Sequence, residues 1–141
     1  MVKMRLSFTR ICRSFSGLFK RLERKKNSGA KFLQTQMVME TSVLEDFCSR
    51  IAQPLDLPVL AGVFLLKSAR NARFINRVVP GACIPEDLIE RLELASDPIA
   101  EGIAIASEQV KSYLEIAQGV HMMAVKAENL IPKILSKAGV N

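Results

Sequence analysis

Pro58-Val-Leu-Ala-Gly-Val-Phe-Leu-Leu66 is a run of nine residues without a charge, and the basic segment Lys67-Ser-Ala-Arg-Asn-Ala-Arg-Phe74 follows it directly. An unbroken apolar run of this length that ends at a polar turn is typical of a strand buried on both faces of a parallel sheet. In such folds, ligands bind where strands end and helices begin. We therefore expect the functional chemistry near Leu66, Lys67, Ser68 and Asn71.

The rest of the chain alternates between helical and extended patterns. Ser42 and Glu45 have the spacing of a capping box, and Asp97-Pro98 is a strong helix start. The apolar stripe of the helix after Asp97 is expected at Ile99, Ile103, Ala106, Val110, Leu114 and Ala117. The expected elements are helix 18–26, strand 31–36, a helix from 42 to about 51, strand 58–66, helices 68–77, 85–92 and 98–118, strand 119–125 and helix 128–138.

This alternation predicts a parallel α/β architecture with right-handed crossovers. A three-stranded parallel sheet has two exposed edges and little surface on which its helices can be buried. A complete (β/α)8 TIM barrel needs about 250 residues, whereas the chain has 141. We therefore expect a partial barrel with covering helices, which exposes 59–66 or 32–33 at an edge. Self-association or a complementary half-barrel chain would cover that edge.

The positive charge of the chain is concentrated at its N-terminus. Residues 1–26 contain nine Lys or Arg and one acid, whereas residues 27–141 contain eleven Lys or Arg and thirteen acids. Three widely spaced cysteines and a single His do not provide the ligand set of a zinc site, so no metal is expected. No apolar run approaches the roughly 20 residues of a membrane span. Reduced thiols favour a cytoplasmic protein.

Residues 1–18 are treated as a basic N-terminal arm, helical or disordered, ahead of a body that covers 19–141. The arm combines Arg and Lys with apolar and Ser residues and has no acid. It fits a helix that packs on the fold, a targeting or membrane-surface segment, or a surface that binds nucleic acid. No aromatic-interleaved RNA motif supports the last reading, and no nucleic-acid partner is expected.

Four landmarks occur in a characteristic order and spacing: Lys25-Lys-Asn-Ser-Gly-Ala-Lys-Phe-Leu-Gln-Thr-Gln36, Leu60-Ala-Gly-Val-Phe-Leu-Leu-Lys-Ser-Ala-Arg-Asn71, Val79-Pro-Gly81 with Ile84-Pro85, and Gly119-Val-His121. With them the chain resembles the C-terminal half of the methylenetetrahydrofolate reductase family, a flavin-dependent β/α barrel. The resemblance covers about 19–140. It implies that the strands are the sixth, seventh and eighth of the barrel.

The resemblance implies two groups of binding residues. Arg21, Arg24 and Lys25 correspond to the family segment that holds the FAD phosphates, a role that suits guanidinium and ammonium groups. Gln36 is similar to a family glutamine that hydrogen-bonds the folate pterin, since an amide both donates and accepts. The remaining substrate-binding candidates are Asn71 in place of a longer family amide, Phe74 or Ile75 as an apolar wall, and Lys126 near a family arginine.

The activity implied is the FAD-dependent reduction of 5,10-methylenetetrahydrofolate to 5-methyltetrahydrofolate, in one-carbon and methionine metabolism. The family places its catalytic acid on the first strand and flavin contacts on the third to fifth, so a truncated or split form that is inactive alone is expected, without a catalytic residue of its own. His121 is read as a structural strand residue. The alternatives are a non-catalytic remnant that acts through a partner or self-association, and a basic-arm binding protein.

Overall fold

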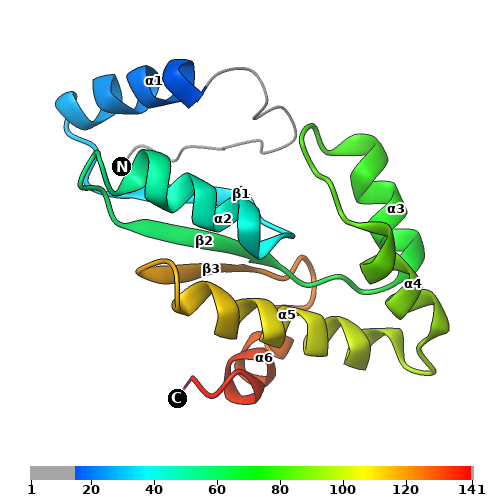
Figure 1. The fold of residues 1–141 in the computed structure, drawn as a ribbon. Coiled ribbons are helices and arrows are strands. Elements are labelled where there is room, and N and C mark those ends of the chain that lie inside the picture. Colours follow the sequence, from blue (N-terminus) through cyan, green and yellow to red (C-terminus); the bar gives the residue numbers. More distant parts are fainter. Residues whose placement is uncertain (1–14, 141) are drawn as a thin grey trace.

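A computed structural model describes residues 15–140 of the chain (Figure 1). Within them, strands β1 (Leu33–Met37), β2 (Val59–Phe64) and β3 (Gly119–Met123) form one parallel sheet in the order β1-β2-β3. This confirms the predicted α/β class. The helical elements are α1 (Phe15–Asn27), α2 (Thr41–Phe47), the π-turn η2 (Cys48–Ala52), α3 (Ala69–Val78), α4 (Glu86–Leu94), α5 (Pro98–Leu114), the 3-10 turn η3 (Glu128–Leu130) and α6 (Ile131–Lys137).

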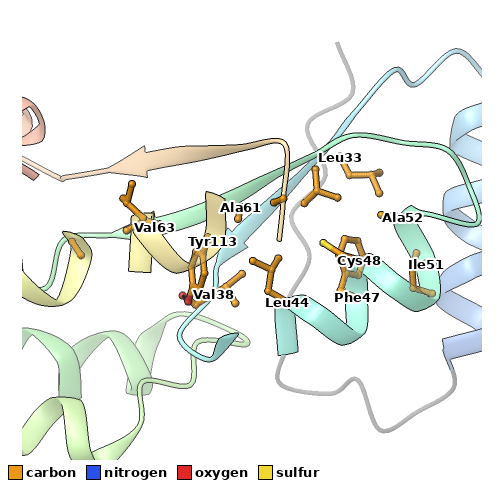
Figure 2. Close-up of a cluster of buried hydrophobic side chains, with 14 of the residues drawn as sticks. Leu33, Val38, Leu44, Phe47, Cys48, Ile51, Ala52, Ala61, Val63 and Tyr113 are labelled. Atoms are coloured by element: carbon orange, nitrogen blue, oxygen red, sulfur yellow. Dashed lines mark hydrogen bonds between the residues drawn. The ribbon is translucent and has the colours of Figure 1, made fainter. Parts of the chain in front are cut away.

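The main core lies between one face of the sheet and the helices α2 and α5 (Figure 2). Leu33, Val59, Ala61 and Val63 are at most 2% exposed, and they alternate along β1 and β2 as residues of one sheet face do. Tyr113 of α5 is fully buried beside them. Burial of this apolar surface, at about 25 cal/mol per Å², is what holds the helices to the sheet.

The expected edge exposure is wrong for 59–66. β2 pairs with β1 on one side and β3 on the other, so it is the central strand of the described sheet. β1 is an edge strand, but Leu33 is 2% exposed because the helix-side core covers it. Exposure falls instead on β3, where each residue is only partly buried.

A second apolar cluster lies beyond the carboxyl ends of the strands, where α3 packs on α4 and α4 packs on α5 (Figure 1). Ile75, Ile89 and Ile105 are among its buried members. The Asn76 side chain fixes the loop between α3 and α4, since its Nδ2 donates to the Ile84 carbonyl at 3.0 Å and its Oδ1 accepts from the Ile84 N–H at 2.8 Å. This cluster sets the position of α3 at the end of β2.

Helix ends follow the sequence signals only in part. Asp97 caps α5 as predicted, accepting from the N–H groups of Ile99 and Ala100 at 3.1 Å. The Ser42–Glu45 capping box is wrong, because Glu40 is the N-cap of α2 and makes no side-chain cap bond.

The apolar stripe predicted for α5 is wrong at Ile99 and Leu114, which are 46% and 40% exposed. Ala117 is buried as predicted, although it lies after the end of the helix. The helix also ends at Leu114 rather than near residue 118. Its buried side is instead formed by Ile103, Ile105, Ala106, Ser107, Gln109, Val110 and Tyr113.

Of the N-terminal arm, residues 15–18 form the first turn of α1, and residues 1–14, with Cys12, lie outside the described residues. The Arg50 guanidinium stacks 3.6 Å from the Phe15 ring centre, which attaches α1 to η2. Among residues 15–140, no helix has the length and apolar character needed to cross a bilayer.

Candidate functional site

Gln36, Asn71 and Lys126 lie at the carboxyl edge of the sheet. Gln36 is the second-last residue of β1, Asn71 is in the first turn of α3 after β2, and Lys126 follows β3 by three residues. Because the three strands are parallel, their carboxyl ends share one edge. The sequence predicted that ligand-binding residues follow the strand ends, and the parallel sheet brings these three residues to one edge.

A bulge in β1 sets the position of Gln36. Leu33 and Gln34 pair with consecutive residues of β2, but the next paired residue is Met37, opposite Gly62. The Thr35 hydroxyl accepts from the Gly62 N–H at 2.8 Å and donates to the Gln36 carbonyl at 2.7 Å. The bulge lies between Gln34 and Met37 and brings the backbone at Gln36 against Gly62.

Gly62 makes this bulge sterically feasible. A Cβ at Gly62 would overlap the Gln36 carbonyl oxygen, and it would lie 2.7 Å from the carbonyl carbon. The backbone of β1 can approach β2 this closely only where β2 has no side chain. Thr35 and Gly62 were not singled out from the sequence, and no local pattern marks them, since their contact joins two strands.

The loop after β2 is tied to the loop after β3. The Ser68 hydroxyl caps α3 by accepting from the Asn71 N–H at 3.1 Å, and Asn71 Oδ1 lies 3.4 Å from the Lys67 N–H. Lys67 Nζ donates to the Val125 carbonyl at 3.1 Å. These contacts hold Asn71 in place with its Nδ2 without a partner among residues 15–140. The Gln36 side chain likewise has no hydrogen bond within that range.

Lys126 occupies a tight turn. Its φ of 55° is in the left-handed region, which costs a non-glycine residue about 1–2 kcal/mol. Its N–H donates to Glu128 Oε1 at 3.1 Å, which supports the turn. The side chain is exposed, so the ammonium group is accessible at the same edge as Asn71.

A hollow of about 820 Å³ extends from this edge along α3, which we call the α3 hollow. Phe74 is 52% exposed there, and the Arg77 guanidinium carbon lies 5.7 Å from its ring centre. Ligand sites commonly have volumes of about 300–1,000 Å³. The lining residues are Lys67, Ser68, Arg70, Asn71, Arg73, Phe74 and Arg77.

Arg21, Arg24 and Lys25 lie on α1, away from the carboxyl edge. Arg24 and Lys25 are in the last turn of that helix, and the neighbouring Lys26 donates to the carbonyl of Leu55, just before β2 begins. This places the turn at the amino end of the sheet (Figure 1). The structure therefore does not bring the two predicted groups of binding residues together at one end.

Two groups with displaced pKa values lie in the core rather than at the carboxyl edge. Burial raises the pKa of the Cys48 thiol to about 11. Burial, with a smaller effect of Glu40, raises the pKa of Tyr113, whose hydroxyl donates to the Val38 carbonyl at 2.7 Å.

Within residues 15–140, no group of three or more His, Cys, Asp or Glu side chains is arranged to hold a metal. The edge is equipped for binding, with amides, an aromatic ring and cations.

His121 lies in the middle of β3, paired with Gly62, and not at the strand end.

Comparisons with known proteins found a matching family and a solved structure of similar fold. A sequence model described as methylenetetrahydrofolate reductase matches residues 11–139. A solved structure, an uncharacterized protein from Clostridium thermocellum that binds two copies of 5-methyl-5,6,7,8-tetrahydrofolic acid, has a similar fold with a TM-score of 0.63 at 18% sequence identity. The similarity covers 89% of this chain and 48% of that one, so the chain spans about half the length of that structure. No curated protein matches the chain.

Proposed function

The chain belongs to the methylenetetrahydrofolate reductase family, and on this premise we propose that the carboxyl edge of its sheet binds a reduced folate. The observation that carries the proposal is the gathering of Gln36, Asn71 and Lys126 from the ends of three different strands. The solved structure of similar fold binds a methylated tetrahydrofolate, which supports the same ligand class.

Each residue has a separate role in this proposal. Gln36 donates to and accepts from the pterin edge, which carries both kinds of group. Asn71 donates through Nδ2, since its Oδ1 faces the Lys67 N–H. Phe74 stacks on the aminobenzoyl ring, and Lys126 pairs with a glutamate carboxylate.

The test is a calorimetric titration of the protein with 5-methyltetrahydrofolate. Gln36→Ala is expected to weaken binding about tenfold, because one lost hydrogen bond is worth about 1–1.5 kcal/mol. The matched control is Gln53→Ala, which removes an exposed amide before β2, at the other end of the strands. Equal losses in the two variants, or no binding by the unaltered protein, would contradict the proposal.

The finer part of the proposal is a flavin-dependent reduction of 5,10-methylenetetrahydrofolate. By charge, Arg21, Arg24 and Lys25 fit a pyrophosphate. By position they fit less well, because the last turn of a helix presents carbonyl groups that disfavour an anion. When bound, reduced FAD would supply the hydride, and these three cations would hold its phosphates.

A visible spectrum after incubation with FAD tests this part separately. Retained flavin absorbance that is lost in Arg24→Gln/Lys25→Gln supports it, and Lys111→Gln serves as the control for removal of an exposed charge. A colourless protein under saturating FAD would refute the flavin part and leave folate binding to be judged by its own titration.

The non-catalytic alternative rests on one observation, the partial exposure of β3 along its whole length. An edge strand of this kind can pair with another chain. Sedimentation of the purified protein tests it. A dimer would support association through a sheet edge, and a monomer at high concentration would oppose it.

A further inference from the structure

The turn after β3 protrudes from the fold and is not held in place by apolar packing. Ala124 and Ala127, at its two ends, are buried, with exposures of 5% and 7%. Between them, the Val125 side chain is 57% exposed and the Lys126 side chain is also exposed. Lys126 has a left-handed backbone, a conformation that persists only where the surrounding contacts enforce it. The position of the Lys126 ammonium group therefore depends on polar contacts to the backbone of this turn.

Two side chains make such contacts, and they differ in where they come from. Glu128 Oε1 accepts from the Lys126 N–H at 3.1 Å, but Glu128 follows Lys126 by two residues and can move together with the turn. Lys67 Nζ donates to the Val125 carbonyl at 3.1 Å from a separate segment, the loop after β2. The Lys67 side chain therefore ties the turn that carries Lys126 to the neighbouring loop of the carboxyl edge.

The backbone of Lys67 is itself fixed beside the start of α3. Its N–H lies 3.4 Å from Asn71 Oδ1, and the preceding Leu66 is only 1% exposed. The Asn71 N–H donates in turn to the Ser68 hydroxyl at 3.1 Å. Lys67 thus contacts Asn71 through its backbone and the turn before Lys126 through its ammonium group. A single residue sets the position of one proposed folate contact relative to the other.

We propose that Lys67 is a positioning residue of the folate site, which holds the turn after β3 so that Lys126 meets the carboxylate of a ligand that Asn71 also contacts. The inference rests on the proposed function, because Lys126 and Asn71 are folate contacts only there. The competing explanation is a direct ion pair between Lys67 and the ligand, since Lys67 also lines the α3 hollow. The two explanations differ in whether the effect of Lys67 requires Lys126.

The experiment is a calorimetric titration of single variants with 5-methyltetrahydrofolate. An exposed ion pair strengthens binding about twofold to fivefold, so Lys126→Met should lose about that factor. Lys67→Met removes the donor and should lose about threefold, and never more than Lys126→Met, because it acts through that residue. Lys67→Arg retains a donor and should restore most of the loss. Lys111→Met removes an exposed lysine of α5 and should leave binding unchanged.

Double variants and hydrogen exchange separate positioning from direct contact. In the Lys126→Met background, Lys67→Met should cause no further loss of binding. In the Gln36→Ala background the full loss should remain, because Gln36 lies on β1 and the Lys67 contacts do not involve that strand. Without ligand, the Ala127 N–H, which donates to the Ala124 carbonyl at 3.1 Å, should exchange about threefold faster in Lys67→Met.

The outcomes distinguish this inference from the proposed function. A full loss from Lys67→Met in the Lys126→Met background would show that Lys67 meets the ligand itself, and it would overturn the positioning role. Unchanged folate binding or unchanged exchange of the Ala127 N–H in Lys67→Met would overturn it as well and leave the folate site standing. If Lys67→Met does not fold, Lys67→Ala takes its place with the same expected results. No folate binding by the unaltered protein would overturn the proposed function, and this inference with it.

Discussion

Replacement of Gly102 by Ala tests how the end of β2 is supported. Gly102 lies within α5, where an Ala would ordinarily stabilise the helix by about 1 kcal/mol. In this structure the new Cβ would overlap the carbonyl oxygen of Leu66 and lie 3.0 Å from its carbonyl carbon. The obstacle is backbone and cannot rotate away, so either α5 or the residues after β2 must move.

The expected magnitude follows from these two opposing effects. Overpacking costs about 1–3 kcal/mol, and we take the upper end because the contact is with a backbone carbonyl. Subtracting the gain in helix propensity of about 1 kcal/mol leaves a net destabilisation of about 2 kcal/mol. For a domain of this size that lowers Tm by about 8 °C. Leu66 directly precedes Lys67, so folate binding should weaken as well.

The assay is urea and thermal unfolding of Gly102→Ala beside the unaltered protein. Ala104→Gly, in the same helix, calibrates the propensity effect and should cost about 1 kcal/mol. Helix propensity alone predicts that Gly102→Ala is more stable than the unaltered protein, whereas the overlap with the Leu66 carbonyl predicts that it is less stable. A variant that matches or exceeds the unaltered protein would refute the close approach of α5 to β2.

Three further predictions follow from buried polar groups. Thr35→Val should destabilise the fold by about 1–3 kcal/mol because it leaves the buried Gly62 N–H without an acceptor, and Thr35→Ser should restore most of the loss in urea unfolding. Tyr113→Phe should cost about 1–2 kcal/mol at neutral pH because it removes a 2.7 Å hydrogen bond to the end of β1, and a variant as stable as the parent would contradict that bond. Burial raises the pKa of the Cys48 thiol from 9.0 to about 11, so the stability that the neutral thiol contributes is complete below pH 9 and is lost as pH rises toward 11. Unfolding curves of Cys48→Ala should therefore show a smaller loss of stability over this pH range. At pH 8 a thiol reagent should modify the exposed Cys83 much faster than the buried Cys48.

The elements themselves could be predicted because their signals are local. The apolar run from Pro58 to Leu66 predicted β2, and Asp97 followed by a proline predicted the start of α5. Strands that alternate with helices require parallel pairing, so the gathering of strand-end residues at one edge was also predictable. The capping box at Ser42 failed because the chain turns into α2 at Glu40, before the expected start.

The details of the candidate site depend on contacts between distant residues. The β1 bulge exists because Gly62 admits the backbone of β1, and the tie between the loops depends on Lys67 reaching Val125. No spacing along the chain encodes either contact. The separation of Arg24 from the carboxyl edge follows instead from connectivity, because α1 ends at Asn27 and a short loop leads to the start of β1 at Leu33.

Hydrophobic periodicity and helix-start residues determined the class of fold, and the order and spacing of four landmark segments indicated the family by resemblance. These signals depend on residues that are close together in the sequence, so they can be identified without the structure. Strand register, the close approach of α5 to β2 and the direction of α3 were decided only in three dimensions, because each is a compromise among side chains that meet from separate segments.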